Sequence, residues 1–160
     1  MRYFYRLVEG LPTIGVMNAL LQNQAKLTDT AVIGVQELIV RDIRSGPALA
    51  TDRDGAKEFP ALKKLALAIM QMIDGTALGQ TILLRAAPKT NMPLGNSSIN
   101  YSSYVMALHS DPRTLLMAGD ETVMIKTGDI WWADMKQDAH LINNSDDDAI
   151  ILLADVMVDS

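Results

Sequence analysis

Two histidines and one aspartate are the residues of this chain whose types and spacing could bind a metal. His109 opens the tripeptide His109-Ser110-Asp111, and His140 is the second histidine of the chain. A His-x-Asp followed by a distant histidine is the pattern of a facial triad, in which two imidazoles and one carboxylate hold Fe(II) and leave coordination positions open. The pattern is weak by itself, because Asp111-Pro112 is also typical of a turn. The residues alone favour two histidines at the surface or at an interface.

Composition excludes several other kinds of chemistry. The chain has no cysteine and therefore no disulfide, thiolate nucleophile or thiolate metal site, which is compatible with a cytoplasmic protein. The net charge is −5, and the second half, residues 81–160, carries eleven acidic residues against five basic ones. Because a phosphate backbone would be repelled by this half, we expect no nucleic-acid partner. The run Asp146-Asp147-Asp148 lacks the spaced ligands of a calcium loop, so we expect a solvated turn there.

Length and hydropathy indicate one soluble domain over residues 1–160. Apolar residues make up 49% of the chain. Its longest apolar stretches, such as Leu65–Met70 and Ile150–Ala154, are far shorter than the roughly 18 residues of a membrane span. The charged start, Met1–Arg6, does not resemble a signal peptide. We therefore expect no membrane partner and a cytoplasmic location after synthesis.

The first half should be helical and extended, and the second half should consist of short strands. Helical spacing predicts helices from Thr13 to about Lys26 and over Pro60–Ile73, while residues 2–8 and Ala31–Ile43 favour extended structure. From Gly79 onward, turn residues separate seven apolar segments: Thr81–Ala86, Tyr104–His109, Thr114–Ala118, Thr122–Lys126, Ile130–Ala133, Ala139–Ile142 and Ala149–Val158. Such spacing predicts an antiparallel barrel or sandwich, residues 79–158, on which residues 1–78 pack. Pro88–Ser102 would be its one long loop.

Several segments resemble the aspartyl/asparaginyl β-hydroxylase family, especially its small phage-encoded members. The resemblance rests on Asp120–Trp132, on Ile142–Asp148 followed by Ile150–Val156, and on the opening Leu7–Pro12. These segments resemble the family's recurring signatures Gly-Glu-x-Trp-Trp-Phe and Asn-x-Ser-x-Asp-x-Arg-Ile-His-Leu. The resemblance implies a mainly β fold with N-terminal helices, namely the double-stranded β-helix or jelly-roll barrel of the Fe(II)/2-oxoglutarate oxygenases, which is similar to that of the cupins.

The same resemblance implies that the ligands of the metal and the cosubstrate are lost. The family's first metal histidine and its acid fall on Gly95 and Ser97, and the distal histidine falls on Ala139. The arginine that binds 2-oxoglutarate falls on Ala149, and the histidine of the family's Arg-Tyr-His falls on Val105. The chain would then use neither Fe(II) nor 2-oxoglutarate as a cofactor.

His140 is the one residue that could rescue a metal site, because it follows Ala139 directly. Neighbouring side chains of a strand point to opposite faces, so His140 should face away from a site that Ala139 faces. Its use as a ligand would require an extra residue to be absorbed in the turn Asp134–Asp138. A dicarboxylate cosubstrate also needs a cation. No lysine or arginine follows Lys136, so the last two strands supply none.

The sequence therefore predicts a non-enzymatic structural or protein-binding protein on an oxygenase-type scaffold. We expect a homo-oligomer or a subunit of a larger assembly, such as a capsid-decorating, tail or adaptor protein of a virion, with Trp131 or Trp132 as an interface anchor. Two alternatives stay open. One is an active Fe(II)/2-oxoglutarate-dependent aspartyl/asparaginyl hydroxylase that uses His109, Asp111 and His140. The other is a metal-free barrel that binds a small molecule.

Overall fold

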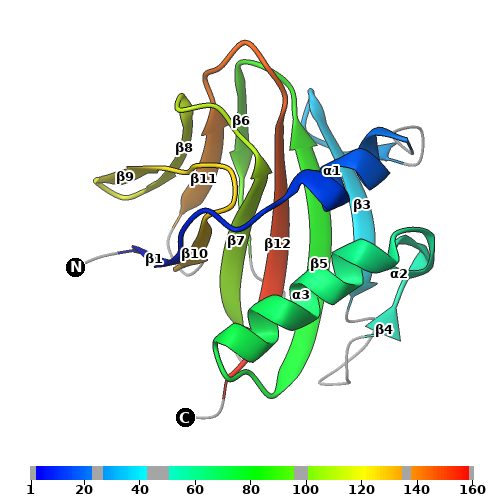
Figure 1. Cartoon of the computed structure of the whole chain (residues 1–160). Helices are drawn as coiled ribbons and strands as arrows, with labels where there is room; N and C mark the ends of the chain where they lie inside the picture. Colours follow the sequence, from blue (N-terminus) through cyan, green and yellow to red (C-terminus); the bar gives the residue numbers. More distant parts are fainter. Residues whose placement is uncertain (1–2, 23–26, 43–50, 96–100, 135–137, 159–160) are drawn as a thin grey trace.

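The computed structural model describes residues 3–22, 27–42, 51–95, 101–134 and 138–158. Two antiparallel sheets face each other in this part of the chain, and helix α3 lies across the outer face of the larger one (Figure 1). No helix of these segments is long and apolar enough to cross a membrane.

The larger sheet has eight strands in the order β1-β10-β7-β12-β5-β3-β2, with β4 paired to β3. Its strands in chain order are β1 Phe4–Val8, β2 Thr28–Asp29, β3 Val35–Asp42, β4 Thr51–Asp52, β5 Ala77–Ala86, β7 Ser102–His109, β10 Ile130–Ala133 and β12 Ala149–Met157. The smaller sheet has the order β6-β11-β8-β9, with β6 Thr90–Pro93, β8 Thr114–Ala118, β9 Glu121–Met124 and β11 Ala139–Asn143. The helices are α1 Ile14–Leu21, α2 Asp54–Glu58 and α3 Pro60–Met72.

From β5 to β12 the chain passes repeatedly between the two sheets. Strands β5, β7, β10 and β12 belong to the larger sheet, and β6, β8, β9 and β11 to the smaller one. This exchange is the arrangement of a double-stranded β-helix, or jelly roll, so the predicted fold class is confirmed. Residues 1–78 also contribute four strands, β1 to β4, to the larger sheet.

The alternation of side chains along the central strands produces two apolar cores. In β12, Ile151 and Leu153 belong to the core between the two sheets, while Leu152 and Ala154 belong to the core beneath the helices. Because β12 is covered on both faces, Ala149–Val156 is buried throughout, which explains why every residue of this segment except Asp155 is apolar.

Helix α3 follows its predicted range to within one residue. Pro60 stands at its first position, where a missing backbone N–H costs nothing, and its buried residues Leu62, Ala66 and Ile69 form one face. The helix ends where the Gly75 amide donates to the Met70 carbonyl at 2.8 Å. This close return needs glycine, because a Cβ at position 75 would lie 2.9 Å from Cγ of Met70.

Three sequence predictions need correction. The predicted loop Pro88–Ser102 contains strand β6, in which Met92 lies opposite Leu141 and is buried. The strand predicted over Ala31–Ile43 begins only at Val35, because the Thr30 hydroxyl accepts from the Val32 amide and holds a turn there. Helix α1 ends at Leu21, before the predicted end near Lys26, which lies outside the described residues.

Candidate functional site

Three of the five positions that correspond by resemblance to the metal and cosubstrate ligands lie inside the barrel. Ala139 begins β11, Ala149 begins β12 and Val105 lies within β7, and all three belong to the apolar core between the sheets. Ala139 and Ala149 are each 1% exposed and Val105 is fully buried. Gly95 directly follows Leu94, and a Cβ built on it would meet nothing within 4 Å. Ser97 lies outside the described residues.

The side chains of Ala139, Ala149 and Val105 do not fit Fe(II) or 2-oxoglutarate. Iron requires nitrogen or oxygen ligands, and the carboxylate of a cosubstrate requires a cation or strong hydrogen-bond donors. The methyl groups of Ala139 and Ala149 and the isopropyl group of Val105 supply neither. All three belong to one cluster of apolar side chains between the sheets.

His109 and Asp111 each have a nearby partner of their own. The Nε2 atom of His109 lies 2.9 Å from Oδ2 of Asp147, and both side chains are well exposed. Hydrogen bonding to His109 and to the Asp148 amide lowers the pKa of Asp147 below its usual value. Asp111 Oδ1 accepts from the backbone amide of Arg113 at 2.9 Å and from its Nε at 3.2 Å, and these contacts lower the pKa of Asp111.

His140 lies on the other sheet and faces outward. Along β11, Ala139, Leu141 and Asn143 are buried while His140 is partly exposed, as strand alternation predicts. Its Nδ1 atom is 2.9 Å from Oδ1 of Asn91, and its Nε2 atom is 3.3 Å from Oδ1 of Asp138. His109, Asp111 and His140 are therefore not brought together. Among the described residues no three histidine, aspartate or glutamate side chains are grouped closely enough to hold a metal.

The Asn-x-Ser signature has a structural role in the turn that follows β11. Asn143 is fully buried, and its amide donates to the carbonyls of Ala86 at 3.0 Å, Ala87 at 3.2 Å and Asp147 at 2.8 Å. Its Oδ1 atom accepts from the amide and the hydroxyl of Ser145. These bonds tie the β11–β12 turn to the end of β5. The signature therefore closes one end of the barrel, and the acidic residues beside it are solvated, as expected for a turn.

The interior also contains a polar pair that the sequence analysis did not single out. Ser103 of β7 lies opposite Asp155 of β12, and its hydroxyl donates to Asp155 Oδ1 at 2.7 Å. Each residue is 1% exposed and stands two positions along its strand from a residue of the inter-sheet core, Val105 or Leu153. A sequence signal existed: Asp155 interrupts an otherwise apolar segment at an inward position.

The two tryptophans lie on opposite faces of β10. Trp131 belongs to the inter-sheet core, and its Nε1 atom is buried without a hydrogen-bond partner among the residues that the structure describes. Trp132 packs on the outer face, with its ring centroid 5.4 Å from that of Tyr5. It lines an open groove of about 540 Å³ together with Tyr5, Leu7, Val8, Met72, Ile73 and Tyr104. Burial raises the pKa of Tyr104, against a smaller opposing effect of a hydrogen bond with Ser102.

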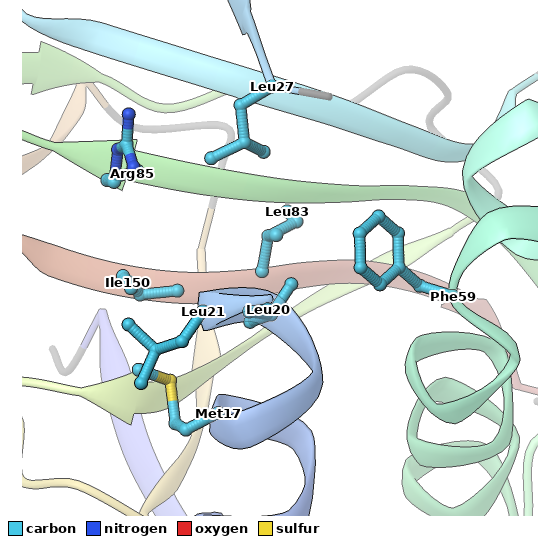
Figure 2. Close-up of a pocket in the computed structure, with 8 residues that line it drawn as sticks. All are labelled: Met17, Leu20, Leu21, Leu27, Phe59, Leu83, Arg85 and Ile150. Carbon is cyan, nitrogen blue, oxygen red and sulfur yellow. The ribbon is translucent and has the colours of Figure 1, made fainter. Parts of the chain in front are cut away.

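A second, much smaller pocket lies beneath α1. Figure 2 shows Met17, Leu20 and Leu21 of α1 over the strands that carry Leu83 and Ile150. Phe59, Leu27 and Arg85 complete the lining, and Arg85 donates to the side-chain carbonyl of Gln36. The pocket has a volume of about 20 Å³, room for about one water molecule, so it is a packing defect between helix and sheet.

Comparisons with known proteins identify the fold. No family model matches the chain, and no curated protein matches it in sequence. Among solved structures, a prolyl hydroxylase from Trichoplax adhaerens has a TM-score of 0.66 at 10% identity, over 96% of this chain and 83% of that one. HygX from Streptomyces hygroscopicus, solved with nickel and 2-oxoglutarate, has a TM-score of 0.65 at 8% identity, over 97% and 82%.

A prolyl-4-hydroxylase from Pseudomonas putida has a TM-score of 0.55 at 12% identity, over 100% of this chain and 95% of that one. These similarities extend over nearly the whole chain, although the identities are too low to transfer an activity. The chain has the double-stranded β-helix fold of the Fe(II)/2-oxoglutarate oxygenases.

Proposed function

We propose that this chain is a non-enzymatic protein that binds other proteins through the outer surface of an oxygenase-type barrel. The observation that carries the proposal is that three of the positions corresponding by resemblance to the metal and cosubstrate ligands hold buried apolar side chains. Ala139, Ala149 and Val105 are buried in one apolar core. A catalytic barrel must keep polar groups there at a cost in desolvation, whereas a barrel without chemistry can fill the space with packing residues.

A protein of this kind would be selected for its outer surface. Assembly with copies of itself or with other subunits, for example in a virion, is the form of function that we favour. Apolar side chains exposed together in the groove beside Trp132 support this proposal, because such patches commonly mark protein contacts.

Metal analysis and a turnover assay test the non-enzymatic part. We expect protein purified with excess Fe(II) to retain far less than one equivalent of iron and to leave 2-oxoglutarate unconsumed under air. The proposal would be contradicted, in favour of the hydroxylase, if the wild-type protein retained one equivalent of iron and formed succinate and if His140→Ala lost the iron. Chemical cross-linking in the native source should recover this chain joined to protein. Recovery of uncross-linked monomer alone would contradict the protein-binding part.

A small-molecule-binding barrel is a second candidate, supported by two buried polar atoms. The Nε1 atom of Trp131 and the hydroxyl of Thr114 lack hydrogen-bond partners within the described segments, although both residues are buried. Buried polar groups are normally paired, so a bound polar molecule would supply a missing partner. Native mass spectrometry of protein from its original source tests this: the candidate requires an added mass that Trp131→Phe abolishes, and a bare chain mass would rule it out.

A further inference from the structure

The C-terminal end of strand β1 is fixed to the turn between β9 and β10. The Gly10 amide donates to Oδ1 of Asp129 at 3.1 Å, and the Leu11 amide donates to the Gly128 carbonyl at 2.9 Å. The two segments pack so closely that a Cβ on Gly128 would overlap the Leu11 backbone. Gly10 has a φ of +70°, and a Cβ there would meet nothing within 4 Å, so the backbone is free to turn at this residue. Gly10 therefore has the properties of a hinge beside a fixed point.

The N-terminal end of β1 is held between the two sheets. On the side of the larger sheet, the Tyr3 carbonyl accepts from the Asp134 amide at 2.8 Å, and Phe4 lies opposite Ala133 of β10. On the side of the smaller sheet, the Phe4 amide donates to Oε1 of Glu121 in β9 at 2.9 Å. The Phe4 side chain is fully buried in the core between the sheets.

A second contact with the smaller sheet explains the glycine at position 119. Gly119 directly follows β8 and has a φ of +57°, and a Cβ there would lie 3.0 Å from Cε2 of Tyr3. The ring of Tyr3 therefore lies against the β8–β9 turn. Strand β9 ends the order of the smaller sheet, and β1 ends the order of the larger one. Tyr3 and Phe4 thus fasten these two sheet edges to each other.

Between its two ends, β1 shields Trp131 of β10 from the side. Arg6 lies opposite Trp131, and residues directly opposite in an antiparallel pair point to the same side of the sheet. Phe4 and Arg6 therefore share the inter-sheet side with Trp131, whose Nε1 atom is buried without a partner in the described segments. Departure of β1 would make β10 the edge strand and expose the indole of Trp131 to solvent.

Strand β1 is held less strongly than the centre of its sheet. It is a five-residue strand at the end of the strand order, and the exposed fractions of Tyr5, Arg6 and Leu7 lie between 42% and 46%. Strand β12, in contrast, pairs on both sides and is buried over Ala149–Val156. An edge element with few buried side chains opens at a lower free energy than central strands do.

We propose that β1 is a strap that swings about Gly10 and opens the barrel interior at Trp131. In the closed position, which the structure describes, Tyr3 and Phe4 fasten the strap to the smaller sheet. In the open position, Phe4 leaves the inter-sheet core and the Nε1 atom of Trp131 meets solvent. Such a strap goes beyond the proposed protein-binding function, and it would supply the entrance that a small molecule inside the barrel requires.

Hydrogen exchange of the Trp131 indole proton, followed by NMR on the full chain, measures this opening. After correction for intrinsic rates, we expect it to exchange at least about tenfold faster than the amides of Ile151 and Leu152 in central β12, which exchange on global unfolding. Equal rates would mean that the indole is exposed only when the whole barrel unfolds, and would overturn the proposal.

A disulfide lock shows whether β1 is the moving element. The chain has no cysteine, and Tyr5 lies opposite Trp132, at a separation that suits a disulfide. In Tyr5→Cys/Trp132→Cys, Trp131 is the single tryptophan. We expect oxidation to bring indole exchange down to the rate of the β12 amides in the same protein, and reduction to restore the difference. An indole that still exchanges faster than these amides after oxidation would place the opening elsewhere and overturn the strap.

Loosening the strap should have the opposite effect. Glu121→Ala removes the acceptor of the Phe4 amide, so the indole should exchange about tenfold faster while the β12 amides change less than about threefold. The matched control is Glu37→Ala, because Glu37 is also a partly exposed glutamate in a strand but lies in β3, away from β1. An unchanged ratio of indole to amide exchange in Glu121→Ala, or the same change in Glu37→Ala, would contradict the proposal.

These outcomes are separate from the tests of function. Fast indole exchange in a protein whose native mass is that of the bare chain would support the strap and remove the small-molecule candidate. A bound small molecule in a protein whose indole exchanges only on global unfolding would overturn the strap and leave that candidate intact. If a variant fails to fold, the comparison of the indole with the β12 amides in wild-type protein still decides the question.

Discussion

Replacing Asn143 with alanine should destabilise the protein strongly, because this buried side chain connects the β11–β12 turn to the end of β5. The side-chain Nδ2 of Asn143, with two hydrogens, lies within hydrogen-bond distance of three backbone carbonyls. Its side-chain Oδ1 accepts two hydrogen bonds from Ser145. A typical hydrogen bond contributes about 1 kcal/mol net, and a buried partner left unsatisfied costs about 1–3 kcal/mol. Asn143→Ala should therefore lower the free energy of unfolding by about 3–4 kcal/mol.

Urea denaturation followed by circular dichroism measures this loss. For a domain of this size, about 3–4 kcal/mol corresponds to a fall in Tm of roughly 6–15 °C. The control is Asn144→Ala in the same turn, because Asn144 is exposed and its hydrogen bonds use backbone atoms: its amide donates to the Arg113 carbonyl, and its carbonyl accepts from Nζ of Lys89. A loss below about 1 kcal/mol for Asn143→Ala, or equal losses for both variants, would refute the structural role assigned to the Asn-x-Ser signature.

Further predictions concern a surface carboxylate, an unpaired indole and two glycines. The pKa of Asp147 is lowered in the folded state, so the carboxylate contributes its full stabilisation above its ordinary pKa of 3.8. This stabilisation is lost as the pH falls through the lower pKa of the folded state. His109→Gln should therefore weaken the pH dependence of the free energy of urea unfolding on the acid side. Trp131→Phe removes a buried donor that has no partner among the described residues, so it should change the free energy of unfolding by less than about 1.5 kcal/mol. Trp131→Ala should lower the free energy of unfolding by about 3–5 kcal/mol, because it leaves a cavity. Similar losses for the two variants would refute the packing role of this side chain. Gly128 has a φ of +88°, and a Cβ there would lie 2.7 Å from the Leu11 amide nitrogen, so Gly128→Ala should lower Tm. Gly15 lies inside α1, and a Cβ there would meet nothing within 4 Å, so Gly15→Ala should raise Tm slightly. Calorimetry that shows the reverse order would contradict both assignments.

The barrel strands could be predicted from local sequence because their signals are local. Gly119 directly follows β8 and Gly128 lies two residues before β10, and both have the positive φ angles of turn residues, so β8 and β10 match their predicted ranges. Buried and partly exposed residues also alternate along β8. Strand β6 was missed because its four residues include Asn91 and Pro93, which are rare in strands. What makes β6 a strand is its pairing with β11, and that pairing is a tertiary contact.

The candidate site depended on contacts that no local pattern contains. Alternation within β11 correctly placed Ala139 inward and His140 outward. The partners of the two histidines, Asp147 for His109 and Asn91 for His140, lie 38 and 49 residues away in the sequence and could not be read from spacing. Tyr5, Trp132 and Tyr104 likewise lie side by side on strands that are far apart in the sequence, so only the register of the sheet reveals their contact.

Isothermal titration calorimetry of 2-oxoglutarate in the presence of Mn(II), under anaerobic conditions, tests the central claim most directly. We propose that the apolar side chains around Ala139 and Ala149 provide ligands for neither the metal nor 2-oxoglutarate. We therefore expect no saturable heat from the metal, from 2-oxoglutarate or from both together. Binding of 2-oxoglutarate at one equivalent per chain that requires Mn(II) and disappears in His140→Ala would contradict it.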